Sequence, residues 1–448
     1  MKVRSSIFVN KLITKVCKMF GKNGSVYPGY IIYDVLKQKD VLNKVKYPKI
    51  VVAVTGSSGK GSTTDLINHI LTDAGYDVCY NKSGSNGVLA AVTLILNNCD
   101  NKGKFMHDVL LLECDERHLK LIFDKKKPSH LIITNMTRDQ PSRNGHPDLV
   151  FKDIVDSIGD DTTLVLNADD PLVNSLKYEK NNRIITYGLD KNIDSYEKLN
   201  NIYPDYAYCP LCNTKLKYKY YNYGHIGNYE CPNCKFKRDK VDYEAKNIDY
   251  EKHSIDINNN SIYLNKDVLY AAYYTVAAYA LCSDIKISDK TIKDAINKDK
   301  QESKRGKELI LDGRKLTMLE SKNENNLSYY QSIKYIVSKK GIKTIILGFD
   351  NVSRRYKYND LSWLWDVDFE KLNNENIDKI LVIGRFRYDV ATRLDLAGIK
   401  KDKMILVDDF NNLLNIVKTT KGELYTMVCF DMTANILNLI KEENHEEV

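Results

Sequence analysis

The sequence predicts an α/β protein with two open, mainly parallel sheets, the first of which carries an inserted cysteine-rich ribbon. Three observations support this fold class. Fully apolar runs alternate with helical segments in both halves of the chain, a glycine-rich turn follows the first run, and two Cys-x-x-Cys pairs interrupt the alternation. A chain of 448 residues is too long for one average domain, so we expect two or three.

The apolar runs have the composition of parallel strands that are covered by helices on both faces. In the first half they are IVVAVTG, DVLLLEC, HLIITNM and TTLVLNA; in the second half they are KLTMLE, TIILGF, KILVIG and KMILVDD. Ligands of such sheets bind at the carboxyl ends of the strands. We therefore expect an N-terminal basic segment over residues 1–45, a central domain over 46–305 and a C-terminal domain over 306–448.

The glycine-rich turn lies in the segment VVAVTGSSGKGSTT, residues 51–64, between a strand and a helix. Its glycines permit a tight turn that directs backbone N–H groups toward phosphate, Lys60 reaches the terminal phosphates, and Ser62 or Thr63 holds Mg²⁺. The spacing between glycines is two residues shorter than in the commonest P-loop, and an ordinary Gly/Ser loop is the alternative. The predicted ATP contacts are Gly56, Ser57, Ser58, Gly59, Lys60, Gly61, Ser62 and Thr63.

Acidic and amide side chains follow two further strands. Glu113 ends the run DVLLLEC and is the predicted second Mg²⁺ ligand, whereas Asp115 and Glu116 could equally cap the next helix. Asn167 and Asp169, in LNADDP, are predicted to touch the nucleoside of ATP, although by themselves they also fit an N-capped turn.

Four cysteines form the motifs CPLC and CPNC, separated by eighteen residues: Cys209, Cys212, Cys231 and Cys234. This spacing is typical of a tetrahedral Cys₄ zinc site. Disulfides are the alternative, but a secretion signal is missing. The surrounding segment, about residues 203–240, has little apolar periodicity, so we expect zinc to supply its folding energy.

The N-terminal segment is cationic, with no acidic residue before Asp34. Its apolar residues recur every four positions, which predicts an amphipathic helix: Phe8, Leu12, Val16 and Phe20. Either this helix packs on the protein body or it contacts a membrane surface. No run approaches the roughly 18 apolar residues of a membrane span, so we expect a cytoplasmic protein, with contact at the inner face of the membrane left open. The net charge of +8 fits a phosphate-bearing substrate or an anionic membrane.

Several motifs together resemble the Mur ligase family. TGSSGKGST, LLECDE, TNMTRDQPSRNG, LNADDP and YGL follow one another in that order. The Cys₄ insertion, TNMTRDQ, SWLWDVDFE (residues 362–370) and GRFRYDVATRLDLAGI (residues 384–399) are more specifically similar to the MurT family, the ligase-like subunits of lipid II isoglutaminyl synthase. The resemblance covers nearly the whole chain.

This resemblance implies an amidotransferase that uses ATP and Mg²⁺ to convert the α-carboxylate of D-glutamate in lipid II into an acyl phosphate. Ammonia from a separate GatD-like glutaminase subunit would then displace phosphate. The chain itself has no Gly-x-Cys-x-Gly elbow for a glutaminase nucleophile. By the same resemblance, Asp360 would complete the Cys–His pair of the partner, with Asp350 as a weaker rival and the capping of a helix as the structural alternative.

Departures from the family leave other functions open. Residues 270–274 read YAAYY and lack two asparagines of the MurT pattern, which puts adenine contacts from this helix in doubt. One alternative is a peptide ligase that works on a pseudomurein-like precursor without a glutaminase. Another is a nucleic-acid-binding module that stacks bases on the ribbon tyrosines Tyr218, Tyr220, Tyr221 and Tyr223.

Overall fold

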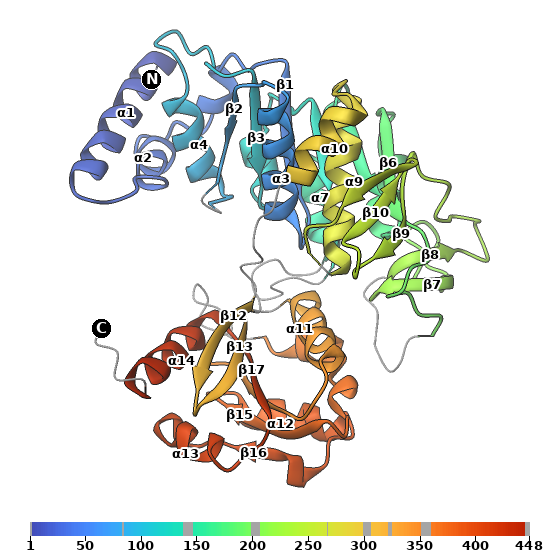
Figure 1. Ribbon diagram of the computed structural model, residues 1–448. Helices are drawn as coiled ribbons and strands as arrows, with labels where there is room; N and C mark the ends of the chain where they lie inside the picture. Colours follow the sequence, from blue (N-terminus) through green and yellow to red (C-terminus); the bar gives the residue numbers. More distant parts are fainter. Residues whose placement is uncertain are drawn as a thin grey trace. The chain divides into compact units, whose positions relative to one another are not determined.

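The computed structural model describes residues 2–82, 85–137, 147–198, 207–266, 268–298, 306–320, 325–350 and 360–443. The chain divides into two compact units, each with its own sheet and hydrophobic core (Figure 1). Within the described residues, no helix has both the length and the apolar character that crossing a bilayer requires.

The first unit contains a nine-stranded sheet that is mostly parallel, as the apolar runs predict. The neighbours from β9 to β2 pair in parallel, and β10 and β11 add an antiparallel edge. In spatial order the strands are β11 (Asn260–Tyr263), β10 (Ser254–Ile257), β9 (Tyr243–Asp249), β6 (Ile184–Leu189), β5 (Thr163–Asn167), β4 (His130–Ile133), β1 (Ile50–Thr55), β3 (Val109–Glu113) and β2 (Val78–Tyr80).

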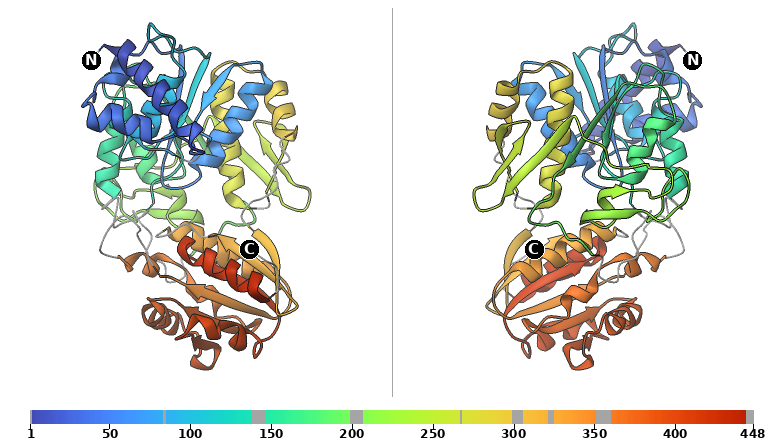
Figure 2. Two further views of the ribbon diagram at one scale, coloured as in Figure 1. Left: turned by 90° about the vertical axis from the view of Figure 1, so that its left-hand side faces the viewer. Right: turned by 90° about the vertical axis from the view of Figure 1, so that its right-hand side faces the viewer.

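Helices cover both faces of this sheet, which explains why its central strands are apolar throughout. One group of helices packs together on one face: α3 (Lys60–Asp73), α9 (Leu269–Asp284) and α10 (Asp289–Lys298). Helices α4 (Val88–Asn97), α5 (Leu119–Ile122) and α7 (Pro147–Val155) cover the other face of the sheet (Figure 2). The core between them and the sheet includes alternate residues of β1 such as Val51 and Ala53. Short helices are η2 (Val41–Lys44), α8 (Pro171–Ser175) and η3 (Leu176–Tyr178).

The N-terminal residues are part of the first unit rather than a separate domain. They form α1 (Val3–Met19), α2 (Tyr27–Tyr30) and the π-helix η1 (Ile31–Val35), and α1 and α2 both contact α4. The amphipathic helix is confirmed, but its apolar face does not pack on the protein body. The four predicted apolar positions are all exposed: Phe8, Leu12, Val16 and Phe20.

The ribbon is inserted between β6 and β9, as the sequence predicts. Its hairpin consists of β7 (Lys217–Tyr223) and β8 (Ile226–Glu230), which form a separate two-stranded sheet. Its core is small and includes two of the cysteines, together with Leu216, Tyr229 and Phe236. So few apolar side chains agree with the expectation that a metal supplies much of the folding energy.

The second unit contains a six-stranded sheet in the order β12 (Gly306–Leu311), β13 (Arg314–Glu320), β17 (Glu423–Val428), β14 (Lys343–Gly348), β15 (Ile377–Ile383) and β16 (Met404–Leu406). All neighbours are parallel except β12 and β13. The helices are α11 (Asn326–Ser338), η4 (Ser362–Asp366), η5 (Phe369–Leu372), α12 (Arg387–Leu396), η6 (Lys401–Lys403), η7 (Phe410–Asn412), α13 (Leu413–Val417) and α14 (Phe430–Glu443). Trp363 anchors η4 in the core. The centroid of its ring lies 5.0 Å from that of Tyr329 and 5.2 Å from that of Phe349.

Candidate active site

The predicted nucleotide-binding residues gather at one edge of the first sheet. The parallel strands β5, β4, β1 and β3 are consecutive in the sheet, so their carboxyl ends meet there. Gly56, Glu113, Asn135 and Asn167 end or follow these four strands. This edge is where doubly wound sheets bind their ligands.

The turn after β1 requires glycine at two positions. Gly56 has a φ of 124°, and a β-carbon there would lie 2.3 Å from Thr134 Oγ1. Gly59, immediately before α3, has a φ of 84°. Both φ values lie in the region that side chains disfavour. The turn therefore runs closely along β4 and leads directly into the N-terminus of α3, where a helix attracts anions.

Residues that follow β4 hold this turn in place. Asn135 accepts a hydrogen bond from Ser58 N at 3.1 Å and donates one to Ser58 O at 3.0 Å, while its own carbonyl accepts from Ser57 N at 2.8 Å. The Ser57 hydroxyl donates to Thr137 O at 2.8 Å. The only signal in the sequence for this role of Asn135 is its place in the apolar run HLIITNM, directly after the predicted strand.

Lys60 forms a buried ion pair with Glu116. The distance from Lys60 Nζ to Glu116 Oε1 is 2.6 Å, both side chains are buried, and Lys60 Nζ also donates to Gly56 O. The alternative that Glu116 caps the next helix is therefore wrong. The carboxylate of Asp115 closes the turn before α5 by accepting from Arg117 N at 3.2 Å.

The oxygen atoms of Glu113 and Ser62, the predicted Mg²⁺ ligands, lie beside the start of α3. Asn86 Nδ2 donates to Glu113 Oε1 at 3.0 Å, and a β-carbon on Gly61 would lie 3.2 Å from Glu113 Oε2. Thr63 is fully buried, and its hydroxyl donates to Gly59 O at 2.9 Å. Of the two hydroxyls considered for Mg²⁺, Ser62 is therefore the accessible one. Carboxylate and hydroxyl oxygens are the ligands that Mg²⁺ prefers, so this pair fits the ion.

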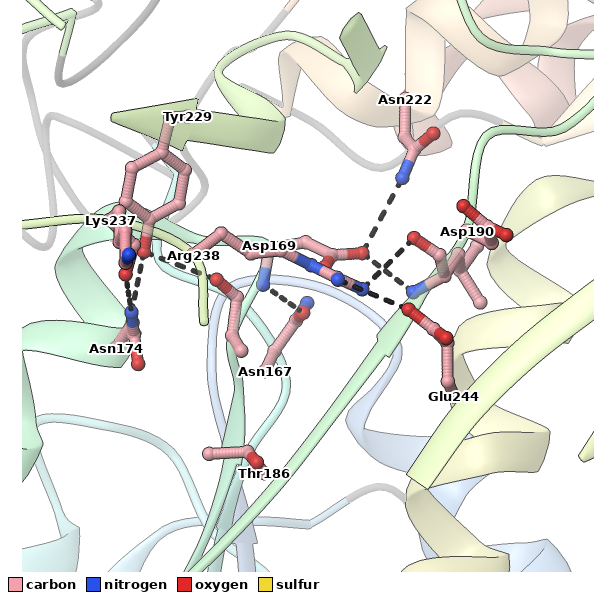
Figure 3. Close-up of polar contacts among 12 residues, drawn as sticks. Asn167, Asp169, Asn174, Thr186, Asp190, Asn222, Tyr229, Lys237, Arg238 and Glu244 are labelled. Atoms are coloured by element: carbon pink, nitrogen blue, oxygen red, sulfur yellow. Dashed lines mark hydrogen bonds and ion pairs between the residues drawn. The ribbon is translucent and has the colours of Figure 1, made fainter. Parts of the chain in front are cut away.

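Asn167 and Asp169 are buried in the protein rather than presented to a nucleotide. Asn167 Nδ2 donates to Thr134 O at 2.9 Å, and its Oδ1 accepts from Asp169 N at 3.1 Å. The predicted contact of Asn167 and Asp169 with the nucleoside is therefore not supported. Both side chains stabilise the protein itself (Figure 3). The physical reason is that the ribbon covers the turn after β5.

The carboxylate of Asp169 is at the centre of a buried polar network (Figure 3). Arg238 Nε donates to Asp169 Oδ1 at 2.9 Å, and Leu189 N and the hydroxyl of Tyr273 each donate to Oδ2 at 2.8 Å. Burial raises the pKa of the Asp169 carboxyl, and the charge of Arg238 acts in the opposite direction. Tyr273 belongs to residues 270–274, the segment of α9 whose adenine contacts the sequence put in doubt. Its hydroxyl instead supports the carboxylate of Asp169.

Asp170 connects the same turn to the P-loop. Its Oδ2 accepts from Met136 N at 2.7 Å, and its Oδ1 caps α8 by accepting from Leu172 N and Val173 N. Met136 lies between Asn135 and Thr137, which hold the P-loop. A continuous series of hydrogen bonds therefore leads from the ribbon junction to the glycine-rich turn.

The four ribbon cysteines converge as a metal site requires. Their sulfur atoms all lie within 4.8 Å of one another, and the pairs Cys209–Cys234 and Cys212–Cys231 are separated by 3.5 and 3.4 Å. These distances exclude disulfides, whose S–S bond is about 2.05 Å. Asn213 and Lys235 follow the two Cys-x-x-Cys turns with positive φ, which gives both turns the same shape. Four convergent thiolates are the donor set of structural zinc.

The ribbon tyrosines pack within the protein. Tyr220, Tyr223 and Tyr229 are buried, and the ring of Tyr218 stacks on that of Tyr221 with centroids 4.1 Å apart. The hydroxyl of Tyr229 donates to Ala168 O at 3.1 Å. Stacking of nucleic-acid bases on these rings is therefore not supported, since their faces are already covered.

Asp360 lies in the second unit at the start of η4. Its Oδ1 accepts from Ser362 N at 2.8 Å and from Ser362 Oγ at 2.5 Å. In both of these bonds Asp360 uses Oδ1, so the capping role accounts for one of its two carboxylate oxygens. Asp368, in the same segment, is buried and pairs with Lys371 at 3.0 Å, so it has a structural role.

Comparison with known proteins finds two family domains in this chain. Residues 54–235 match the Mur ligase middle domain, and residues 323–433 match the MurT ligase C-terminal domain. The MurT subunit of the glutamine-hydrolyzing lipid II isoglutaminyl synthase of Staphylococcus aureus (strain N315) is 28% identical over 399 residues, 88% of each chain. The chain therefore contains a Mur ligase middle domain and a MurT ligase C-terminal domain, and it is similar to MurT subunits over most of its length.

Other relatives agree with these domains and with this fold. The MurT subunit from Streptococcus pneumoniae (strain ATCC BAA-255 / R6) is 28% identical over 407 residues, 89% of this chain and 88% of its own. A pseudomurein peptide ligase type C from Methanothermus fervidus has a similar fold, with a TM-score of 0.67 over 90% of this chain and 81% of its own, at 20% identity. MurF ligase from Thermotoga maritima, solved with ADP, has a TM-score of 0.57 over 92% of this chain and 85% of its own, at 16% identity.

Proposed function

We propose that this chain is the ATP-dependent subunit of an amidotransferase that converts the α-carboxylate of D-glutamate in lipid II, or a related lipid-linked envelope peptide, into an amide. The observation that carries this proposal is the P-loop at the sheet edge in a chain similar to MurT subunits over 88% of its length. A GatD-like glutaminase is the proposed partner, because a subunit named for glutamine hydrolysis implies a source of ammonia.

The proposed reaction has two steps. A carboxylate oxygen of the acceptor attacks the γ-phosphorus of ATP, and ADP leaves with the electron pair of the broken P–O bond. Ammonia then attacks the acyl carbon, inorganic phosphate leaves, and the nitrogen loses a proton to give the amide. The first step is needed because an ionised carboxylate resists a nitrogen nucleophile until one of its oxygens becomes a good leaving group.

The residues of the P-loop have separate roles in this proposal. The backbone N–H groups of residues 56–61 and the start of α3 bind the phosphates of ATP. Lys60 neutralises charge on the transferred phosphoryl group, and Glu116 and Asn135 position the lysine and the turn. Ser62 and Glu113 would hold Mg²⁺, which would neutralise negative charge on the phosphates.

Two further sites complete the proposal. Cys209, Cys212, Cys231 and Cys234 hold zinc, which stabilises the ribbon. Asp360 supplies the carboxylate that orients the catalytic histidine of the glutaminase, with its Oδ2 as the oxygen not used in capping Ser362. We also propose that the protein works at the inner face of the membrane, where a lipid-linked acceptor is accessible.

Mass spectrometry of the lipid-linked precursor tests the function. The purified chain, a GatD-like partner, ATP, Mg²⁺ and glutamine labelled with ¹⁵N in its amide should convert the acceptor carboxyl into a ¹⁵N-amide. Omission of the partner should block the reaction with glutamine but not with ammonium. Addition of an amino acid instead of ammonia would identify a peptide ligase, and failure to hydrolyse ATP with all components present would contradict the proposal.

A further inference from the structure

The outward face of α1 is a continuous apolar stripe. Phe8 and Phe20 have exposed fractions of 67% and 78%, and Leu12, Val16 and Met19 are also exposed. Positions 8, 12, 16 and 19 repeat at the spacing of helical turns, so they lie along one side of the helix. Exposure of so much apolar surface is unfavourable in water unless something covers it.

This orientation is set by specific hydrogen bonds on the opposite side of α1. Ser6, Ile7 and Asn10 are buried. The Asn10 side chain donates to Thr93 O at 3.1 Å and to Asn97 Oδ1 at 3.0 Å, both on α4. This inward face also buries Ile7 and packs Val3 and Val9 against the core, so rotating the helix to bury Phe8 would break the hydrogen bonds and expose those side chains. The apolar stripe is held outward by the fold.

The neighbouring α2 and η1 extend the exposed apolar surface. Both elements contact α1, and their exposed side chains are Val26, Tyr27, Tyr30 and Val35. Nearly half of the exposed large apolar side chains in the described chain lie within residues 8–36. Two of them are tyrosines, whose polar hydroxyl and apolar ring suit the boundary between water and lipid.

Positively charged side chains line one border of the stripe. Arg4, Lys15, Lys18 and Lys22 are exposed, and no carboxylate of the described residues forms an ion pair with them. On a helix of 3.6 residues per turn, positions 4, 15 and 18 lie along one border of the stripe, whereas Lys11 donates to Cys99 O at 2.7 Å. An apolar strip with cations along its edge matches the acyl boundary and the phosphate headgroups of an anionic bilayer.

We propose that the outward face of α1, α2 and η1 docks this protein on an anionic membrane surface. The helix would lie in the plane of the interface, with Phe8, Leu12 and Phe20 entering the acyl boundary and Lys15 and Lys18 contacting headgroup phosphates. A 17-residue helix has a length of about 25 Å, which gives enough contact for reversible binding but does not span the bilayer. This proposal stands on the surface itself and does not require the proposed amidation to be correct.

Flotation of the full-length chain with lipid vesicles tests the proposal without nucleotide or a nitrogen source, so its outcome is independent of enzymatic activity. We expect binding to vesicles of equimolar phosphatidylglycerol and phosphatidylcholine to exceed binding to pure phosphatidylcholine by at least about tenfold, and to weaken as salt is added. The variant F8Q/L12Q/F20Q should lose at least about tenfold in affinity for the mixed vesicles. The variant K15E/K18E should lose more than about tenfold, since each cation contributes about fivefold.

Matched controls separate this face from a general effect of composition. I193Q/L396Q removes two other exposed apolar side chains, and K400E/K418E reverses two other exposed lysines; both variants should bind as the unchanged protein does. Equal melting temperatures would show that α1 remains folded. Unchanged vesicle binding by F8Q/L12Q/F20Q would overturn the proposal. Loss of self-association or of partner binding in that variant, with vesicle binding retained, would show that a protein covers the face and would also overturn it.

Discussion

Arg238 donates from Nε to Asp169 Oδ1 at 2.9 Å and so joins the end of the ribbon segment to the turn that follows β5. Both side chains are buried, with exposed fractions of 6% and 0%. A second ion pair, from Arg238 to Glu244 at 3.1 Å, fixes the guanidinium against β9. The ribbon is therefore attached to the nucleotide-binding edge by buried charge.

Replacement of Arg238 by methionine should destabilise the first unit by about 3–5 kcal/mol, because it leaves the Asp169 carboxylate buried without its cation. The measurement is denaturant unfolding followed by circular dichroism. Lys246→Met is the control, since Lys246 forms a surface pair with Glu244 and such pairs contribute at most about 1 kcal/mol. Equal effects of the two variants would contradict a structural role for the buried pair.

Cys212→Ser should reduce zinc content and melting temperature together, because the ribbon has too few apolar side chains to fold well without metal. Affinity for ATP should also fall, because the ribbon supports the turn that holds Asp169 and Asp170. Asp170 in turn accepts from Met136 N, next to Asn135, which holds the P-loop. Zinc is measured by elemental analysis and ATP binding by calorimetry. Cys17→Ser is the control outside the ribbon, and an unchanged metal ratio in Cys212→Ser would exclude the site.

Lys60→Met should lower ATP-dependent amidation by about 100- to 1000-fold with either glutamine or ammonium as nitrogen source. The lysine acts on phosphate, so the nitrogen source does not matter. Lys120→Met removes a partly exposed lysine that pairs with Asp153, and it should retain activity. Substantial amidation by a folded Lys60→Met protein would refute the assignment of the P-loop.

Asn135→Ala should weaken ATP binding by about tenfold or more, because its side chain makes two hydrogen bonds to Ser58 and each contributes roughly 1 kcal/mol. Calorimetry with a non-hydrolysable ATP analogue provides the measurement. Asn182→Ala also removes side-chain hydrogen bonds to a loop, around Gly159 and Thr162, and should leave ATP affinity unchanged. If both variants lose affinity equally, the effect is general destabilisation.

Asp360→Asn should reduce glutamine-driven amidation by at least about 100-fold and leave ammonium-driven amidation near its normal rate. The reason is that a glutaminase triad needs a charged carboxylate, whereas the ligase reaction does not. Ser362→Ala removes a capping partner but keeps the carboxylate, so it distinguishes catalysis from local structure. Equal losses with both nitrogen sources would indicate that Asp360 is only structural.

Local patterns in the sequence predicted eight strands of the two sheets, the glycine-rich turn and the ribbon, but missed β17, which lies in the middle of the second sheet. Buried parallel strands need continuous apolar runs such as residues 108–114, a tight phosphate-binding turn needs Gly56 and Gly59, and a zinc ribbon needs paired cysteines at short spacing. These signals lie within a few residues of one another. They do not depend on which distant segments meet.

The tertiary structure decided the roles that depend on distant partners. Glu116 pairs with Lys60, 56 positions away, and Asp169 is covered by Arg238, 69 positions away. The direction of the apolar stripe on α1 was likewise set by hydrogen bonds from Asn10 to α4, more than 80 positions along the chain. Periodicity reveals that a helix has an apolar side, but only the contacts of its other side determine whether that stripe faces the core or the solvent.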